Sequence, residues 1–242
     1  MAATLRTDIG KLRKQNEDAA WFDEARAVFA VADGMGGHLA GEVASRMAIE
    51  AVQRMARENE RPGIAALREA VACAHETILT HAQDHIECAG MGTTLSVLWL
   101  GENYAYIAHV GDSRIYRLRE GSLTQITQDH SLVEELVRAG LITREQARTH
   151  PRRNIITRAL GTHGENEPDL LVTDVQDGDV FLLCTDGLTG MVTDAQIERM
   201  LLENDMEAAA DALLAAALDA GGRDNVTLIL CERRGASAWN RD

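Results

Sequence analysis

The chain has 242 residues, a formal net charge of −14 and an apolar fraction of 45%. This charge argues against a nucleic acid as partner, because binding to a phosphate backbone needs an excess of Lys and Arg. A single domain of this length buries roughly 70–75% of the surface that its unfolded chain exposes. Because no repeat or linker interrupts the chain, we expect residues 1–242 to form one domain with a frayed tail at about 234–242.

The cysteines and the apolar runs indicate a compartment. Cys73, Cys88, Cys184 and Cys231 are scattered without a C-x-x-C pair, and the last two lie in strand-like runs, so we expect reduced thiols, buried at Cys184 and Cys231. No run approaches eighteen apolar residues, and the first residues lack the apolar centre of a signal peptide. We therefore expect a cytoplasmic protein without a membrane partner.

The chain begins with a charged cluster at residues 11–18, followed by the apolar residues 19–22. One interpretation is a polar turn before a strand. The other is a functional segment in which Arg13 binds an anion beside the cation-binding acids Glu17 and Asp18. The segment alone does not decide between them.

The stretch at residues 28–38 is the one around which the rest is organised. A short apolar run ends at Asp33, and three glycines follow within four residues. The run predicts a buried strand, and residues without Cβ atoms would let the backbone approach an ion bound by Asp33. Apolar residues at helical spacing then predict helices over about 39–58 and 63–81.

A pattern of short antiparallel strands follows, which makes a doubly wound parallel sheet improbable on physical grounds. Strands are predicted at 93–100, 104–110, 115–119 and 123–126, then at 180–184 and 226–231. Helices are predicted from Thr193 to about residue 202 and over 206–220. Residues 127–166 interrupt this pattern of strands with two short helices capped by Ser131 and Thr143. We therefore expect an insertion between strands that is large enough to cover a neighbouring part of the protein.

Five aspartates stand at the ends or starts of strand-like runs: Asp18, Asp33, Asp112, Asp186 and Asp224. Each one alone is explained as a turn residue. Together they indicate a site, because antiparallel sheets can bring distant strand ends to one edge, where several carboxylates would repel one another without a cation. No His or Cys at ligand spacing accompanies them, so the set favours Mg²⁺ or Mn²⁺ over zinc or copper.

Two such ions bridged by one acid would generate a hydroxide nucleophile near neutral pH and bind phosphoryl oxygens. Arg13 is then the candidate phosphate ligand, because its guanidinium can hold two oxygens. The chain has no Walker sequence, no protein-kinase loop, no dinucleotide-binding G-x-G-x-x-G and no G-x-S-x-G elbow. These absences argue against NTP-driven transfer, a Rossmann domain and a serine hydrolase.

Seven motifs occur in order between about residues 5 and 232: residues 13–18, 33–38, 92–94, 111–114, 128–133, 185–187 and 222–225. Together they resemble the metal-dependent protein serine/threonine phosphatases of the protein phosphatase 2C (PPM) family, in their compact bacterial form. The resemblance implies an α+β fold, a four-layer α-β-β-α sandwich with two central antiparallel sheets flanked by helices. The insertion at 127–166 would be the flap beside the active site.

The resemblance also implies roles for the site residues. Asp33 would bridge two Mn²⁺ or Mg²⁺ ions, the Gly34 carbonyl would bind one of them, and Asp186 and Asp224 would hold the other. Glu17 and Asp18 would act mainly through metal-bound waters, and Asp112 with Asp186 would complete a third, weaker site. Arg13 matches the phosphate-binding arginine. Met35 stands where eukaryotic relatives have a proton-donating histidine, and a thioether cannot donate a proton; His38 is a weaker candidate for that task.

The function implied is hydrolysis of phosphoserine and phosphothreonine in proteins, without a covalent phosphoenzyme. The expected partners are phosphorylated proteins and a Ser/Thr protein kinase whose modification the enzyme reverses, and the chain is expected to be a monomer. Two alternatives stay open: a pseudophosphatase that binds phosphoproteins, and a small-molecule phosphatase or phosphodiesterase on the same scaffold.

Overall fold

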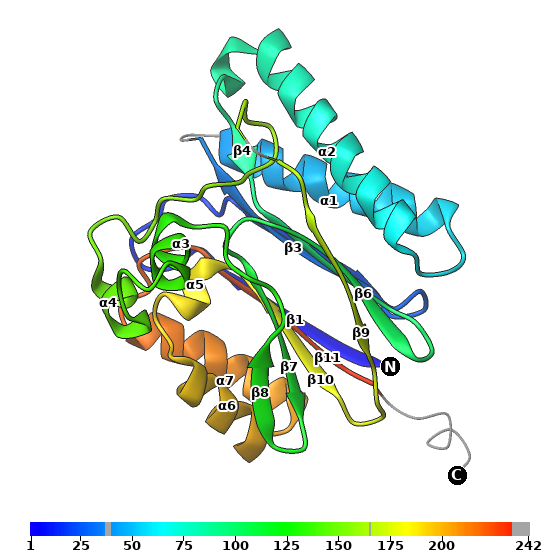
Figure 1. Ribbon diagram of the computed structural model, residues 1–242, viewed down its shortest axis with the longest axis vertical. Helices are drawn as coiled ribbons and strands as arrows, with labels where there is room; N and C mark the ends of the chain where they lie inside the picture. The colour runs from blue at the N-terminus through cyan, green and yellow to red at the C-terminus, as the bar shows by residue number, and fades with distance from the viewer. Residues whose placement is uncertain (37–39, 165, 234–242) are drawn as a thin grey trace.

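Two antiparallel β-sheets lie face to face, and helices cover both outer faces (Figure 1). The computed structural model describes residues 1–36, 40–164 and 166–233. The layers therefore follow the order helices, sheet, sheet, helices. This arrangement is the four-layer sandwich expected from the sequence.

Each sheet combines strands from distant parts of the chain. The first sheet has the order β1 (Ala2–Asp8), β11 (Val226–Glu232), β10 (Val180–Cys184), β7 (Arg114–Arg119) and β8 (Ser122–Gln125). The second has the order β2 (Asp18–Asp23), β3 (Val28–Met35), β5 (Leu95–Leu100), β6 (Tyr104–Val110) and β9 (Asp169–Asp174), with β4 (Gly92–Thr93) paired to β3. All of these pairings are antiparallel.

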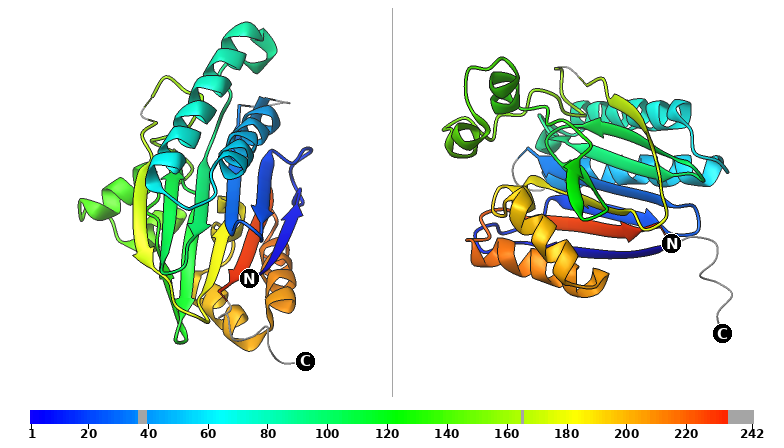
Figure 2. Two further views of the ribbon diagram at one scale, coloured as in Figure 1. Left: turned by 90° about the vertical axis from the view of Figure 1, so that its right-hand side faces the viewer. Right: turned by 60° about the horizontal axis from the view of Figure 1, so that its bottom comes forward.

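The helices fall into three groups. α1 (Ala40–Glu58) and α2 (Ile64–Asp84) cover the second sheet, and α2 is followed by the short 3₁₀ helix η1 (Ile86–Cys88). α5 (Asp186–Thr189), α6 (Asp194–Glu203) and α7 (Met206–Asp219) lie on the first sheet. The insertion carries α3 (Leu132–Arg138) and α4 (Arg144–Thr149), which project from one end of the sandwich (Figure 2).

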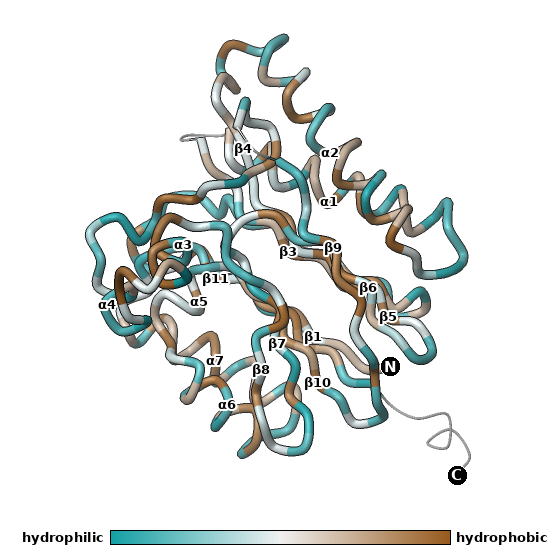
Figure 3. Tube along the Cα trace, in the orientation of Figure 1, coloured by the Kyte–Doolittle hydropathy of each residue, from teal (hydrophilic) through white to brown (hydrophobic). Residues whose placement is uncertain are grey.

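Side chains along the central strands are buried on both faces of each sheet. In β3, Val28, Ala30 and Ala32 pack with the helices, whereas Phe29 and Val31 face the other sheet. Because successive side chains of a strand point to opposite faces, a run buried on both sides is apolar throughout. The hydropathy colouring shows this concentration of apolar residues along the strands, with hydrophilic residues at their turns (Figure 3).

Most predicted elements are confirmed. The hairpin of β5 and β6 forms, and Ser131, Thr143 and Thr193 each cap a helix by accepting a hydrogen bond from a backbone N–H three residues later. The predicted start of the first helix at Leu39 and the frayed tail at 234–242 lie outside the described residues.

Four elements differ from the expectation. β1 and β9 were not predicted as strands, because each lies at the edge of a sheet and is only partly apolar. β3 continues through Asp33 to Met35 instead of ending at the acid, because Gly34 and Met35 pair with β4. The short helix α5 was not predicted either, because the apolar pattern after Thr185 does not indicate it.

The described cysteines are free, and Cys184 and Cys231 are fully buried, as predicted. Burial raises the pKa of the Cys184 thiol to about 12, so it stays protonated and unreactive. Among the described helices, none has both the length and the apolar content needed to cross a bilayer.

Candidate metal centre

Asp18 and Asp33 lie opposite each other at one end of the second sheet. They are cross-strand neighbours in the β2–β3 pair, and the next residues remain close because the Gly34 N–H donates to the Glu17 carbonyl at 3.1 Å. Gly34 has no room for a side chain, since a Cβ there would collide with the carbonyl of Gly41 in α1. The backbone of helix α1 thus closes on the acid-bearing strand.

Asp186 and Asp224 come from the first sheet, at the end of β10 and just before β11. The Thr185 hydroxyl joins the two sheets, because it donates to Asp18 Oδ2 at 2.9 Å. Thr185 also donates its N–H to the Thr227 carbonyl, which holds β10 and β11 in register at this point. The four aspartates therefore lie where the ends of both sheets meet.

Asp112 lies in the turn between β6 and β7, and Thr94 connects this turn to Asp33. The Thr94 hydroxyl accepts from the Asp33 N–H at 2.9 Å and shares a 2.8 Å hydrogen bond with the Ser113 hydroxyl. The Thr93 hydroxyl in turn donates to the Asp33 carbonyl. Two threonines from one motif thus fix the backbone of the central acid.

The pKa values of these carboxyls show that burial and mutual repulsion act on them together. Burial, followed by the charges of Asp18, Asp186 and other acids, raises the pKa of Asp33 well above its usual range. Burial raises the pKa of Asp18 to about 7, with Asp186 and Asp224 adding to the rise, and raises that of Asp186 to about 6, again helped by Asp224. Burial and then Asp186 also raise the pKa of Asp112.

The donor set fits hard divalent cations. Asp18 Oδ1 is buried without a hydrogen-bond partner, which is an acceptor that a cation or its water shell would satisfy. Within the described residues, no three acidic, imidazole or thiol side chains already form a closed metal cage. The charge effects nevertheless show that the carboxyls act on one another, and Mg²⁺ sites commonly complete their shells with waters.

Arg13 lies at the edge of this group, in the loop between β1 and β2. Its Nη2 donates to Asp224 Oδ2 at 2.8 Å, its Nη1 lies 3.8 Å from Glu17 Oε2, and 47% of its side chain is exposed. Burial raises the pKa of Glu17, and the charge of Arg13 opposes that rise. Every residue predicted to bind a cation or the phosphate is therefore described and lies in this region, whereas His38 lies outside the described residues.

Asn225 is a site residue to which the sequence assigned no role. Its Oδ1 accepts from the Glu17 N–H at 2.8 Å, and its Nδ2 donates to the carbonyls of Ile9 and Gln15 at 2.9 Å each. It thereby fixes both ends of the loop that carries Arg13. The motif at 222–225 contained this residue, but its partners are more than two hundred residues away in the sequence, so no local pattern revealed the contact.

The motif at residues 128–133 holds the turn that carries Asp112 in place through hydrogen bonds. The Gly111 N–H donates to His130 Nδ1 at 3.1 Å, and the His130 N–H donates to the Gly111 carbonyl at 2.7 Å. The fully buried His109 has a pKa lowered to about 4 by burial, so it is neutral, and its Nε2–H donates to the Gln128 carbonyl at 3.1 Å. The motifs at 111–114 and 128–133 therefore form one hydrogen-bonded unit.

The flap borders a cavity of about 310 Å³ beside the acids. Asp112 and Asp186 line it from the sandwich, and Val137, Arg148 and Arg153 line it from the flap. The insertion at 127–166 thus lies over the candidate site, as the sequence led us to expect.

Comparisons with known proteins agree with this geometry. The sequence profile described as protein phosphatase 2C matches residues 11–224. The chain is 41% identical to the serine/threonine phosphatase stp of Listeria welshimeri over 242 residues, covering 96% of both chains. It is similar to the crystal structure of the Mycobacterium tuberculosis serine/threonine phosphatase PstP/Ppp, with 40% identity, a TM-score of 0.91 and coverage of 97% of this chain and 99% of that one.

A structure of the PstP catalytic domain in complex with two manganese ions is also similar, with 38% identity, a TM-score of 0.88 and coverage of 97% of this chain and 98% of that one. The ions are a property of that complex, but its similarity accords with the all-oxygen donor set described above.

The raised carboxyl pKa values predict that the metal-free protein becomes less stable as the pH rises. A carboxyl whose pKa is higher in the folded state stabilises the fold fully below its unfolded value of 3.8, and this contribution is lost as the pH rises through the folded pKa, about 6 for Asp186 and about 7 for Asp18. In chelator we expect the melting temperature to fall between about pH 4 and 7, by about 2–4 °C for each kcal/mol lost.

Mn²⁺ should raise the melting temperature more at the upper end of that range, because a cation favours the ionised carboxylates. The control is Asp18→Asn, which cannot ionise and should flatten the profile in chelator. Thermal melts at constant ionic strength measure both effects, and a melting temperature that rises with pH in chelator would contradict the assignment.

A second prediction concerns His130. His130→Leu removes the acceptor of the buried Gly111 N–H and should lower the free energy of unfolding by about 1–3 kcal/mol, the usual cost of an unsatisfied buried donor. It should also raise the Mn²⁺ concentration needed for half-maximal activity. His130→Asn places an amide oxygen near the lost Nδ1 and should recover part of both effects, as measured by urea unfolding and Mn²⁺ titration. Equal behaviour of the two variants would argue against this role.

Proposed function

The chain belongs to the protein phosphatase 2C family, and we propose that it hydrolyses phosphoserine and phosphothreonine in proteins with the help of two divalent cations, Mn²⁺ or Mg²⁺. The observation that carries the proposal is the gathering of aspartates from both sheets, with raised pKa values and one buried oxygen of Asp18 left without a partner. Keeping several carboxylates ionised and close together is unfavourable without a cation, and a bound cation makes it favourable.

In this proposal Asp33 would contact both cations, the Gly34 carbonyl would bind one, and Asp186 and Asp224 would hold the other. Glu17 and Asp18 would act through water, and Asp112 with Asp186 would hold a third, weaker ion. When bound, the cations would supply an activated water as nucleophile near neutral pH and neutralise charge on the phosphoryl oxygens. The chemistry of these groups also supports the proposal, because the only ligand atoms they would offer to a cation are oxygens.

The chain's own residues orient the substrate. About half of the Arg13 side chain, 47%, is exposed while one of its guanidinium nitrogens donates to Asp224, so it is placed to receive phosphate oxygens beside the acids. Met35 cannot donate a proton, so we propose that water protonates the departing serine or threonine oxygen. His38 lies outside the described residues.

The proposed substrates are proteins phosphorylated by a cognate Ser/Thr kinase, and the proposed compartment is the cytoplasm. Relatives named serine/threonine phosphatase, matched over 96% of their length, support this class of substrate. A phosphoprotein-binding role without catalysis is separated from it by the experiment that follows.

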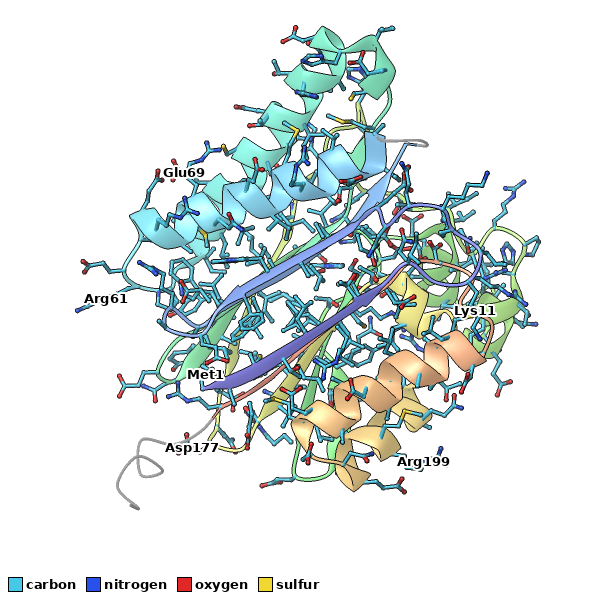
Figure 4. The ribbon with its side chains drawn as sticks, turned by 180° about the vertical axis from the view of Figure 1, so that it is seen from behind. Met1, Lys11, Arg61, Glu69, Asp177 and Arg199 are labelled. Atoms are coloured by element: carbon cyan, nitrogen blue, oxygen red, sulfur yellow. The ribbon has the colours of Figure 1, made fainter. Side chains whose placement is uncertain are left out.

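Activity on a phosphothreonine peptide should be abolished by a chelator and restored by Mn²⁺. Asp33→Asn and Asp186→Asn should each lower kcat/KM at least about a hundredfold, because replacing even an outer partner of a metal site commonly costs 10–100-fold. Asp177→Asn, an exposed acid far from the site in Figure 4, is the matched control and should behave like the parent protein. Phosphate release is the measurement, and near-normal turnover of Asp33→Asn in Mn²⁺ would refute the proposal.

Arg13→Ala should raise KM for the phosphopeptide by about 10–100-fold, because hydrogen bonds to charged groups contribute about 1.5–3 kcal/mol. Arg13→Lys keeps the charge but loses the two-pronged geometry, and it should fall between the parent and the alanine variant. A Mn²⁺ titration of each variant shows whether the lost contact with Asp224 disturbs the cations instead. An unchanged KM in Arg13→Ala would remove Arg13 from the phosphate site.

A further inference from the structure

The loop between β1 and β2 contains both lysines of the chain. Lys11 and Lys14 bracket Arg13, whereas all the other cationic side chains among the 24 Lys and Arg residues are arginines. Lysine differs from arginine in presenting a compact, flexible point charge that does not need a planar partner. The position of the two lysines therefore places adaptable positive charge beside the proposed phosphate ligand.

The backbone of this loop is held firmly. Asn225 Nδ2 donates to the carbonyls of Ile9 and Gln15, one at each end of the loop, at 2.9 Å. The Lys11 N–H donates to the Gly222 carbonyl at 2.7 Å, and Figure 4 places Lys11 at the edge of the molecule, near the end of α7. The loop therefore presents its side chains from a fixed position.

The side chains at the tip of the loop are open. Lys11 and Lys14 are exposed and form no hydrogen bond or ion pair through their ammonium groups with any described residue. Leu12, which lies between Lys11 and Arg13, is 70% exposed. Arginines elsewhere are used internally, such as Arg119, which bonds Asp174 and Asp179. The charge of the two lysines is therefore available to a ligand.

An acidic ligand fits this tip. The whole chain carries a net charge of −14, so an acidic peptide is repelled over most of the surface and attracted only where positive charge is concentrated. When Arg13 holds the phosphate of a substrate, residues one to three positions away lie within about 4–11 Å along the extended peptide. Lysine side chains beside Arg13 reach that distance.

We propose that Lys11 and Lys14 select substrates in which acidic side chains flank the phosphorylated serine or threonine. This inference rests on the proposed phosphatase function and names the class of substrate that its site prefers. Each exposed ion pair contributes little, so the expected preference for an acidic over a neutral flank is about three- to tenfold in kcat/KM. High salt should reduce it, because exposed charges are screened.

The test compares three phosphothreonine peptides that differ only in flanking residues, which are Asp, Asn or Lys. The proteins are the parent, Lys11→Gln/Lys14→Gln, and the matched control Arg57→Gln/Arg61→Gln, which makes the same change in net charge; Figure 4 shows Arg61 on the opposite side of the molecule from Lys11. The ratio of kcat/KM for the Asp and Asn peptides should fall to about one in the lysine variant and stay at the parent value in the control. An unchanged ratio in the lysine variant, or an equal loss in both, overturns the proposal.

Chemical modification gives a second test on the parent protein. Amine-specific acetylation reaches Lys11, Lys14 and the N-terminal amine and removes their charge, whereas reductive methylation of the same groups keeps it. The acetylated protein should lose the preference for the acidic peptide and the methylated protein should keep it. Loss in both, or in neither, contradicts a role of charge.

Hydrolysis of the neutral peptide reports on the proposed function separately. If the parent protein cleaves it in Mn²⁺ without preferring the acidic peptide, the inference about the lysines is wrong and the phosphatase function stands. If no peptide is cleaved, the phosphatase function and the inference fall together.

Discussion

The structure depends on keeping several carboxylates close together although they repel one another. Two like charges at about 4 Å repel by about 4 kcal/mol at the effective dielectric constant typical near a protein surface. The raised pKa values of Asp18, Asp33 and Asp186 are the consequence of this repulsion together with burial. The chain does not relieve the repulsion by moving the acids apart, because hydrogen bonds to the neighbouring backbone hold them.

These hydrogen bonds come from uncharged side chains. The Thr94 hydroxyl accepts a hydrogen bond from the Asp33 N–H, and the Thr185 hydroxyl donates one to Asp18. The Asn225 side chain forms hydrogen bonds with three backbone groups around Glu17 and the Arg13 loop. A neutral partner fixes position without cancelling the negative charge that a cation needs. The three buried apolar clusters between the four layers of the sandwich provide rigid support. Because both faces of each sheet are packed, the strand ends cannot shift independently.

Much of the site could be predicted from sequence because its chemistry coincides with strand ends. Asp33 and Asp186 follow apolar runs that are buried on both faces, and that pattern is local. The edge strands β1 and β9 could not be predicted in the same way, since an edge strand needs fewer apolar residues and its identity depends on the partner it meets. The roles of individual acids came from the resemblance to a family, because spacing alone says which residues are acidic and not which one faces which ion.

Contacts across long sequence separations mark the limit of a sequence-based prediction. Asn225 and Thr185 are ordinary polar residues beside glycines and aspartates, and their importance appears only when the two sheets face each other. The bond from Gly111 to His130 is of the same kind, although it joins two motifs that are both visible in the sequence. A sequence motif therefore identifies residues that support the site, whereas only the fold shows which groups they hydrogen-bond to.

The flap is built on different principles from the sandwich. None of the residues of α3 and α4, all of which are described, belongs to the three buried apolar clusters, and both helices begin at a polar cap. The insertion is joined to the sandwich by backbone hydrogen bonds, such as those from the His130 N–H to the Gly111 carbonyl and from the Leu160 N–H to the Thr93 carbonyl. Because the sequence of α3 and α4 is not constrained by core packing, these helices can change while the acids keep their positions. The Arg13 loop is fixed by Asn225 and can vary only at its exposed side chains. Selectivity for different substrates can thus vary at two places, the flap and the Arg13 loop, around the carboxylate centre that is proposed to hold the cations.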